Sequence, residues 1–114
     1  MKTLAEVFEH TLRDVYWAEN ALTKALPKVS KAVGNADLKA AFDAHLKETK
    51  GHIKTLDQVF KSIGKEASGE KCDAMEGLLK EADGLMAEAE GQALDVAMIG
   101  AAQAIAVCPF RAFK

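Results

Sequence analysis

Residues 4–33 read LAEVFEHTLRDVYWAENALTKALPKVSKAV, and this stretch decides the fold class. Its apolar residues recur at steps of three and four, which places them in one stripe along an α-helix. A single glutamate interrupts the stripe, whose members are Leu4, Phe8, Leu12, Val15, Glu19, Leu22, Leu26, Val29 and Val33. We therefore expect a long amphipathic helix that ends at Gly34-Asn35, with left-handed backbone at that point.

A second amphipathic helix is expected between Asp37, taken as its N-cap, and Gly64. Because the connection to the first helix is so short, the two helices should form an antiparallel hairpin. The inward stripe of this second helix also contains polar positions, and it reads Leu38, Phe42, His45, Glu48 or Thr49, His52, Leu56, Val59 and Ile63.

Two shorter helices are expected after a polar connection, over residues 72–90 and 93–107, with Gly91 between them and Pro109 closing the last one. The last segment is apolar on almost every side, so we expect it to be buried on several sides. No alternating strand pattern and no internal repeat occur in the sequence. The prediction is one all-α domain over residues 1–114.

The charge balance excludes several classes of partner. Fifteen basic and seventeen acidic residues leave a formal charge of −2, and no run of basic residues occurs. Electrostatic binding to nucleic acid or to an anionic membrane is therefore disfavoured. The start of the chain lacks the apolar stretch of a secretory signal, and no uncharged apolar segment is long enough to cross a membrane. We expect a cytoplasmic protein.

Three polar residues occupy positions where the helical pattern calls for apolar ones: Glu19, Glu48 and His52. With Asn35 at the centre of the turn and a rise of about 1.5 Å per residue, all three should lie within about 5 Å of one level along the hairpin. Glu48 and His52 are four residues apart and share a helical face. Carboxylates and an imidazole that converge in a bundle core suit iron or manganese. The alternative is a buried ion-paired cluster without metal.

Four blocks of the chain read FEHTLRDVYWAE (8–19), HLKETKGH (45–52), KCDAMEGL (71–78) and AAQA (101–104). Together they resemble the YciE/YciF ferritin-like stress proteins of bacteria, and the similarity runs from about residue 3 to residue 105. It implies a ferritin-like antiparallel helical bundle whose short third helix is a crossover. It also implies a cytoplasmic, often dimeric stress protein with a possible di-metal centre, in which Glu19, Glu48 and His52 would supply the first half of the ligands.

The C-terminal part departs from that family. Where the relatives continue with acidic and histidine ligands, this sequence has Ala106, Val107, Cys108 and Pro109, and the last helix of the family is absent. One chain would therefore offer only half of a di-metal site. Either the site is lost, leaving a non-catalytic association protein, or two chains pair as a homodimer or higher homo-oligomer and each contributes its half. Any enzymatic activity and its catalytic residues are left open.

Four further residues have weaker claims to a role. Tyr16 should pack in the core with its hydroxyl at the rim, although it could support the metal ligands from one turn away. His45 should line the bundle, with a ligand role as the alternative. Trp17 lies off the main stripe, which suggests a second contact surface. His10 lies on the polar side of the first helix, where we expect it to be merely exposed.

Overall fold

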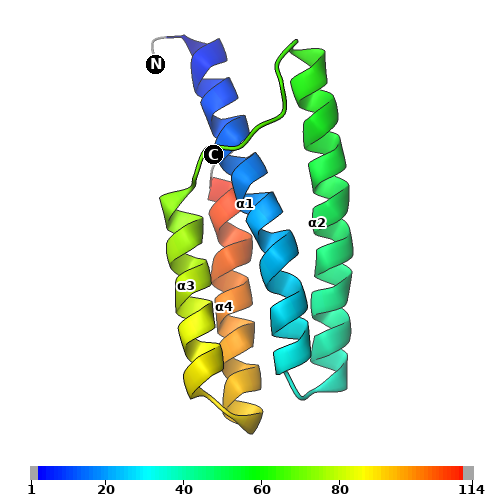
Figure 1. Cartoon of the computed structure of the whole chain (residues 1–114), viewed down its shortest axis with the longest axis vertical. Coiled ribbons are helices and arrows are strands. Elements are labelled where there is room, and N and C mark those ends of the chain that lie inside the picture. The colour runs from blue at the N-terminus through cyan, green and yellow to red at the C-terminus, as the bar shows by residue number, and fades with distance from the viewer. Residues whose placement is uncertain (1–2, 112–114) are drawn as a thin grey trace.

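The computed structural model describes residues 3–111, with side chains through Ala104, and in that range it is an all-helical bundle without strands (Figure 1). The bundle measures 48 × 23 × 20 Å. Its four helices are α1 (Leu4–Ala32), α2 (Ala36–Ser62), α3 (Asp73–Glu88) and α4 (Gly91–Arg111). The all-α, antiparallel prediction is confirmed. Residues 106–109, where the sequence departs from the YciE/YciF pattern, have side chains that lie outside the described ones.

Helix α1 packs along α2, while α3 packs mainly on α4 and each of them touches α1 in fewer places. The second hairpin is shorter than the first, so α1 and α2 extend beyond it at one end of the bundle (Figure 1). Leu4 and Phe8, which we expected in the core, lie at that end and are exposed. The rest of the α1 stripe is buried, as its periodicity predicts.

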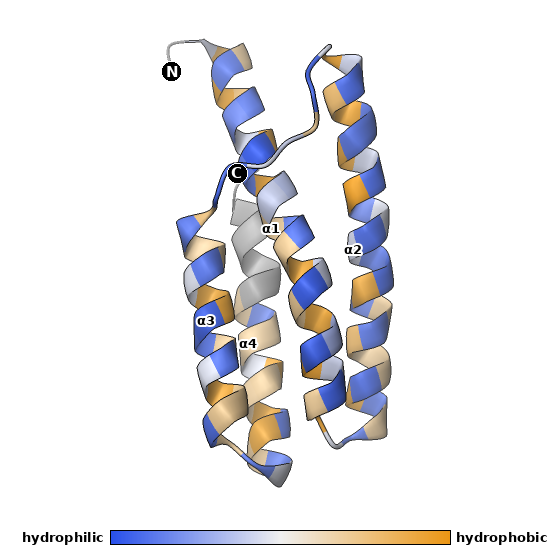
Figure 2. Cartoon of the chain, viewed as in Figure 1, coloured by the Kyte–Doolittle hydropathy of each residue, from blue (hydrophilic) through white to orange (hydrophobic). Residues whose placement is uncertain are grey.

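The buried side chains form two clusters. The larger one joins all four helices and contains Ala18, Leu22, Leu26, Val29, Val33, Phe42, Met75, Leu94 and Met98. The smaller one lies between α1 and α2 and contains Leu12, Val15, Leu56 and Phe60. Apolar residues line the inner faces of the helices, and polar residues cover the outer ones (Figure 2).

The turn between α1 and α2 corrects two sequence-based expectations. Asn35, and not Asp37, is the N-cap of α2, and its side-chain oxygen accepts a hydrogen bond from the Leu38 backbone N–H at 3.0 Å. The backbone at Asn35 is extended rather than left-handed. Asp95 of α4 satisfies this turn as well, because its carboxylate accepts from the backbone N–H groups of Gly34 at 2.9 Å and of Asn35 at 3.2 Å.

The connection between α2 and α3, residues 63–72, crosses over α1 as an extended segment (Figure 1). Arg13 of α1 holds it: the guanidinium donates to the carbonyl of Glu66 at 3.4 Å, to the carbonyl of Ser68 at 3.0 Å and to the Ser68 hydroxyl. Gly69 lies directly against Trp17, and a Cβ added to this glycine would lie 2.8 Å from the Cβ of Trp17. The connection thus covers the backbone and Cβ of the off-stripe tryptophan, whose partly buried side chain packs against the larger core cluster.

Helix α4 begins at Gly91, whose φ of +60° marks the break after α3. It continues through Pro109 to Arg111, so the expected stop at that proline is wrong; the φ of a proline is itself helical. Leu94 and Met98 are buried, whereas Val96 and Ile99 are exposed, at 69% and 44%. The expected burial on several sides is therefore not met within one chain. Within the described residues, no helix is long and apolar enough to span a membrane.

Candidate metal centre

Glu19 is a carboxylate within the apolar stripe of α1. It lies one turn from both Val15 and Leu22, and only 7% of its surface is exposed. Its Oε2 atom accepts no hydrogen bond from the described residues, and the nearest cationic partner is Nδ1 of His52 on α2, at 3.6 Å. An unsatisfied buried carboxylate oxygen is costly, so it is a position that a cation would stabilise.

The environment of Glu19 raises the pKa of its carboxyl group. Burial is the main cause, because it disfavours the charged form. His52 and His45 act in the opposite direction through electrostatic attraction, but they do not cancel the effect of burial. The carboxyl thus binds its proton more tightly than a solvent-exposed glutamate does.

On α2, the buried polar residue near the level of Glu19 is Thr49. It is fully buried, and its hydroxyl donates to the carbonyl of His45 at 2.9 Å. One residue corresponds to about 100° of rotation on a helix, so Glu48 lies off this buried face and is exposed. No hydrogen bond or ion pair among the described residues joins Glu48 to Glu19. The structure thus brings together Glu19 and His52, while Glu48 lies apart.

Tyr16 packs as the sequence predicts. Its ring meets that of Phe60 edge-on, with centroids 5.5 Å apart, and its hydroxyl donates to Oδ1 of Asp57 at 2.9 Å. Burial and the neighbouring Asp57 carboxylate raise the pKa of Tyr16. The hydroxyl is therefore engaged at the rim with Asp57.

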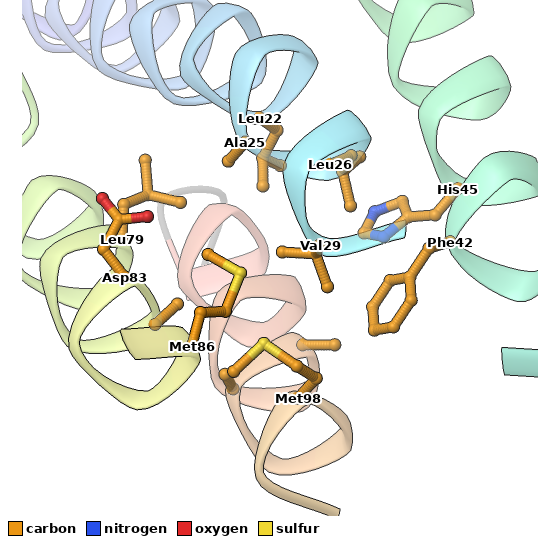
Figure 3. A pocket seen from close by; sticks show the side chains of 13 residues that line it. Leu22, Ala25, Leu26, Val29, Phe42, His45, Leu79, Asp83, Met86 and Met98 are labelled. Carbon is orange, nitrogen blue, oxygen red and sulfur yellow. The ribbon is translucent and has the colours of Figure 1, made fainter. Parts of the chain in front are cut away.

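A cavity of about 20 Å³ lies deeper in the bundle, between all four helices, and Figure 3 shows its lining. Its walls are almost entirely apolar, with His45 and Asp83 as the polar exceptions. The side chains of Met86 and Met98 project into the space between the helices (Figure 3). None of Glu19, Glu48 and His52 lines this space. The cavity is therefore part of the apolar core and separate from the carboxylate.

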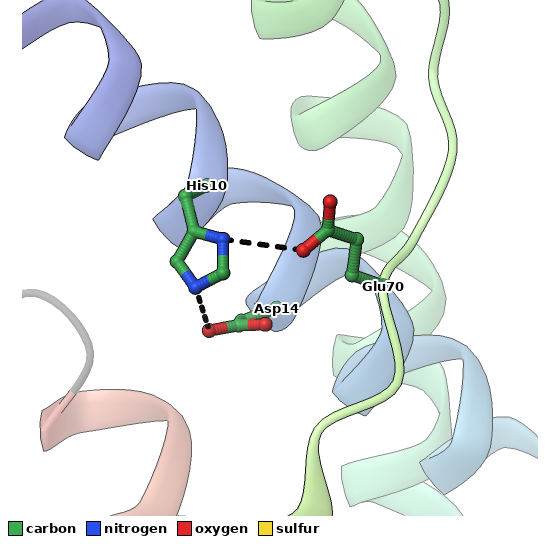
Figure 4. Close-up of side chains that lie close together, drawn as sticks. All are labelled: His10, Asp14 and Glu70. Carbon is green, nitrogen blue, oxygen red and sulfur yellow. Dashed lines mark ion pairs between the residues drawn. The ribbon is translucent and has the colours of Figure 1, made fainter. Parts of the chain in front are cut away.

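A second group of potential ligands lies on the outer side of α1. His10 has an ion-pair contact with Asp14, one turn along the same helix, and another with Glu70 of the crossing connection (Figure 4). One ligand atom from each of the three lies within 4.8 Å of the other two. The i, i+4 spacing of His10 and Asp14 is visible in the sequence, but the approach of Glu70 depends on the path of an irregular segment.

Comparison with known proteins now adds the family. A family described as "Domain of unknown function (DUF892)" matches residues 3–108, which is nearly the whole chain. The chain belongs to this family. It is 45% identical over 107 residues to Protein YciF of Escherichia coli (strain K12), an alignment that covers 92% of this chain and 64% of that relative. The chain thus spans a little less than two thirds of the length of that relative.

Two solved structures have the same fold. The E. coli stress protein YciF superposes with a TM-score of 0.85 at 44% identity, over 92% of this chain and 67% of that one. YcfI from Rhodopseudomonas palustris superposes with a TM-score of 0.87, also at 44% identity, over 91% of this chain and 67% of that one. The resemblance to the YciF family and its ferritin-like helical fold is thereby confirmed.

Proposed function

We propose that this DUF892 protein acts as a cytoplasmic stress protein that binds iron or manganese at Glu19 and His52, and that a second copy of the chain completes the centre. The observation that carries the proposal is the buried Oε2 of Glu19, which has no hydrogen-bond donor among the described residues. The 44–45% identity to the stress protein YciF supports the biological setting.

The donor set of the chain suits these metals. Carboxylate oxygen and imidazole nitrogen are ligands of iron and manganese, and ferritin-like centres use four glutamates and two histidines. Glu19 and His52 supply two of these six donors, since Glu48 lies apart from them on the exposed side of α2. A two-fold dimer would double the set, because an interface of this symmetry places the same residues on both sides.

Apolar residues left exposed in one chain support pairing. Val96 and Ile99 of α4 are exposed, as are Leu4, Val7 and Phe8 at the start of α1. Burying such residues against a second copy stabilises association by about 25 cal/mol per Å² of apolar surface removed from water.

The residues of the chain have separate roles in this proposal. Glu19 would hold the ion through its carboxylate, because a positive charge compensates for the burial that disfavours the charged form. His52 is 59% exposed and would hold the ion through Nδ1, the ring nitrogen that lies 3.6 Å from Oε2 of Glu19. A bound iron or manganese ion would supply redox chemistry, such as the removal of peroxide or the oxidation of ferrous iron.

Metal content measured together with solution mass tests the proposal. Purified protein, loaded anaerobically with Fe²⁺ or Mn²⁺ and desalted, should retain about one or two ions per dimer. Glu19→Gln should lose this metal while its mass is unchanged. Glu81→Gln, on the exposed side of α3, is the matched control and should retain it. Equal metal content in Glu19→Gln and wild type would refute the assignment.

The exposure of Glu48 favours a second candidate function, a helical association protein without metal. In that case the protein would be dimeric by light scattering, yet it would retain no iron or manganese above background after anaerobic loading. A strict monomer at high micromolar concentration would contradict both the completed metal centre and the association role.

A further inference from the structure

His10 lies between two carboxylates that come from different parts of the chain (Figure 4). Its Nε2 is 3.4 Å from Oδ2 of Asp14, and its Nδ1 is 3.1 Å from Oε2 of Glu70. Asp14 belongs to α1, like His10, whereas Glu70 belongs to the connection that crosses it. The three side chains are partly exposed, so ions in solution can reach them.

The two carboxylates make different demands on the ring in its two forms. A neutral imidazole has one N–H group, so it can donate to one carboxylate while its other nitrogen presents a lone pair to the second. Two acceptors repel each other at such a distance. Either a second ring proton or a metal ion bound to the lone pair and a carboxylate turns this repulsion into attraction.

The protein holds Glu70 in this place through contacts that do not involve its carboxylate. The backbone N–H of Glu70 donates to the carbonyl of Arg13 at 3.2 Å. The Arg13 side chain binds the preceding residues of the connection, and Gly69 lies directly against the backbone and Cβ of Trp17. A ligand fixed by its own backbone loses little conformational entropy when it binds an ion.

We propose that His10, Asp14 and Glu70 form a second cation site, one that takes a divalent transition metal of the Zn²⁺ class. Zn²⁺ binds imidazole nitrogen and carboxylate oxygen at about 2.0–2.2 Å, so two of its ligands lie roughly 3–4 Å apart. The three ligand atoms here, within 4.8 Å of one another, need only a small side-chain adjustment to reach that spacing.

This site is separate from the one at Glu19. His10 precedes Glu19 by nine residues, about two and a half helical turns, so the two side chains project from opposite faces of α1. Two basic residues of α1 and the connection are engaged with other partners. Arg13 and Lys65 each lie 3.6 Å from Oε1 of Glu9, and Arg13 also donates to the connection. The two carboxylates outnumber the single imidazole, so the site itself is negative.

Zn²⁺ titration of the full-length, tag-free chain tests the inference. Calorimetry gives the affinity, and Co²⁺ or Cu²⁺ quenching of Trp17, the single tryptophan, reports binding close to this place. His10→Gln and Glu70→Gln should each weaken Zn²⁺ binding about tenfold or more, the effect typical of disturbing a metal ligand set. Glu66→Gln is the matched control, since Glu66 contributes its backbone carbonyl to Arg13 and its side chain is exposed.

The outcomes separate this site from the proposed iron or manganese centre. Zn²⁺ binding and quenching that persist in Glu19→Gln and disappear in His10→Gln support the inference. Unchanged affinity in both His10→Gln and Glu70→Gln overturns it. A wild type that binds no Zn²⁺, because the cluster takes a proton only, also overturns it, whatever the iron or manganese content of Glu19 turns out to be.

Discussion

Replacing Glu19 with leucine should stabilise the metal-free protein. The substitution removes a buried acceptor that has no hydrogen bond, a defect that costs about 1–3 kcal/mol. It also removes the attraction of His52, which is worth less than about 1 kcal/mol because that histidine is more than half exposed. The free energy of unfolding should rise by about 1–2 kcal/mol. In a chain of this length, each kcal/mol raises the Tm by roughly 4 °C.

The stability that Glu19→Leu gains over the wild type should increase as the pH rises. Burial raises the pKa of Glu19, so the folded state holds this proton more tightly than the unfolded chain does. The wild type therefore loses stability as the pH rises through the raised folded-state pKa. The advantage of Glu19→Leu should be smallest below the ordinary pKa of glutamate and should reach its full size above the raised value.

Thermal unfolding followed by circular dichroism, in EDTA at pH 4 and pH 8, measures both effects. Glu48→Gln is the control, because substitution of an exposed residue should change stability by no more than about 0.5 kcal/mol. Adding Mn²⁺ should raise the Tm of the wild type and leave that of Glu19→Leu unchanged. A Glu19→Leu protein less stable than the wild type in EDTA at pH 8 would refute the reasoning.

Three other substitutions test contacts that hold the fold. Asp95→Ala removes the acceptor of two backbone N–H groups in the α1–α2 turn and should lower the free energy of unfolding by about 1 kcal/mol in urea titrations. Gly69→Ala forces a Cβ against Trp17 and should cost about 1–3 kcal/mol, with a shift in tryptophan emission that a tolerated alanine would not produce. Tyr16→Phe loses the hydrogen bond to Asp57 and should lower the free energy of unfolding by about 0.5–1.5 kcal/mol. In the wild type, the phenol of Tyr16 should titrate above the ordinary pKa of tyrosine, and a spectrophotometric titration with an ordinary pKa would contradict this.

Much of the fold is predictable from the sequence because a buried helix face repeats with the helical period. The stripe from Leu12 to Val33 is buried in the structure, and the short connection after it makes α2 antiparallel. The rise per residue of a helix also predicts that Glu19 and His52 lie at one level, and in the structure Oε2 of Glu19 is 3.6 Å from Nδ1 of His52. Leu4 was misplaced because periodicity does not show how far the second hairpin extends.

Other parts of the site depend on information that a single stripe lacks. Glu48 and Thr49 are adjacent in the sequence, and the rotation of α2 about its axis decides which of them is buried. Asn35 caps α2 by accepting a hydrogen bond from the N–H of Leu38, three residues on, and Asp37 could have accepted the equivalent bond from Ala40. Glu70 lies in an irregular segment whose path is set by Arg13, so no helical pattern predicts its approach to His10.

The division into two hairpins has a consequence for folding kinetics. Most contacts lie within the α1–α2 pair or the α3–α4 pair, so each pair can form from residues that are close in the sequence, and such local contacts favour fast folding. The slower step is then the docking of one finished hairpin on the other. Asp95 reaches from α4 to a turn that exists only after α1 and α2 have paired. Weakening this late contact should speed unfolding and leave the folding rate nearly unchanged.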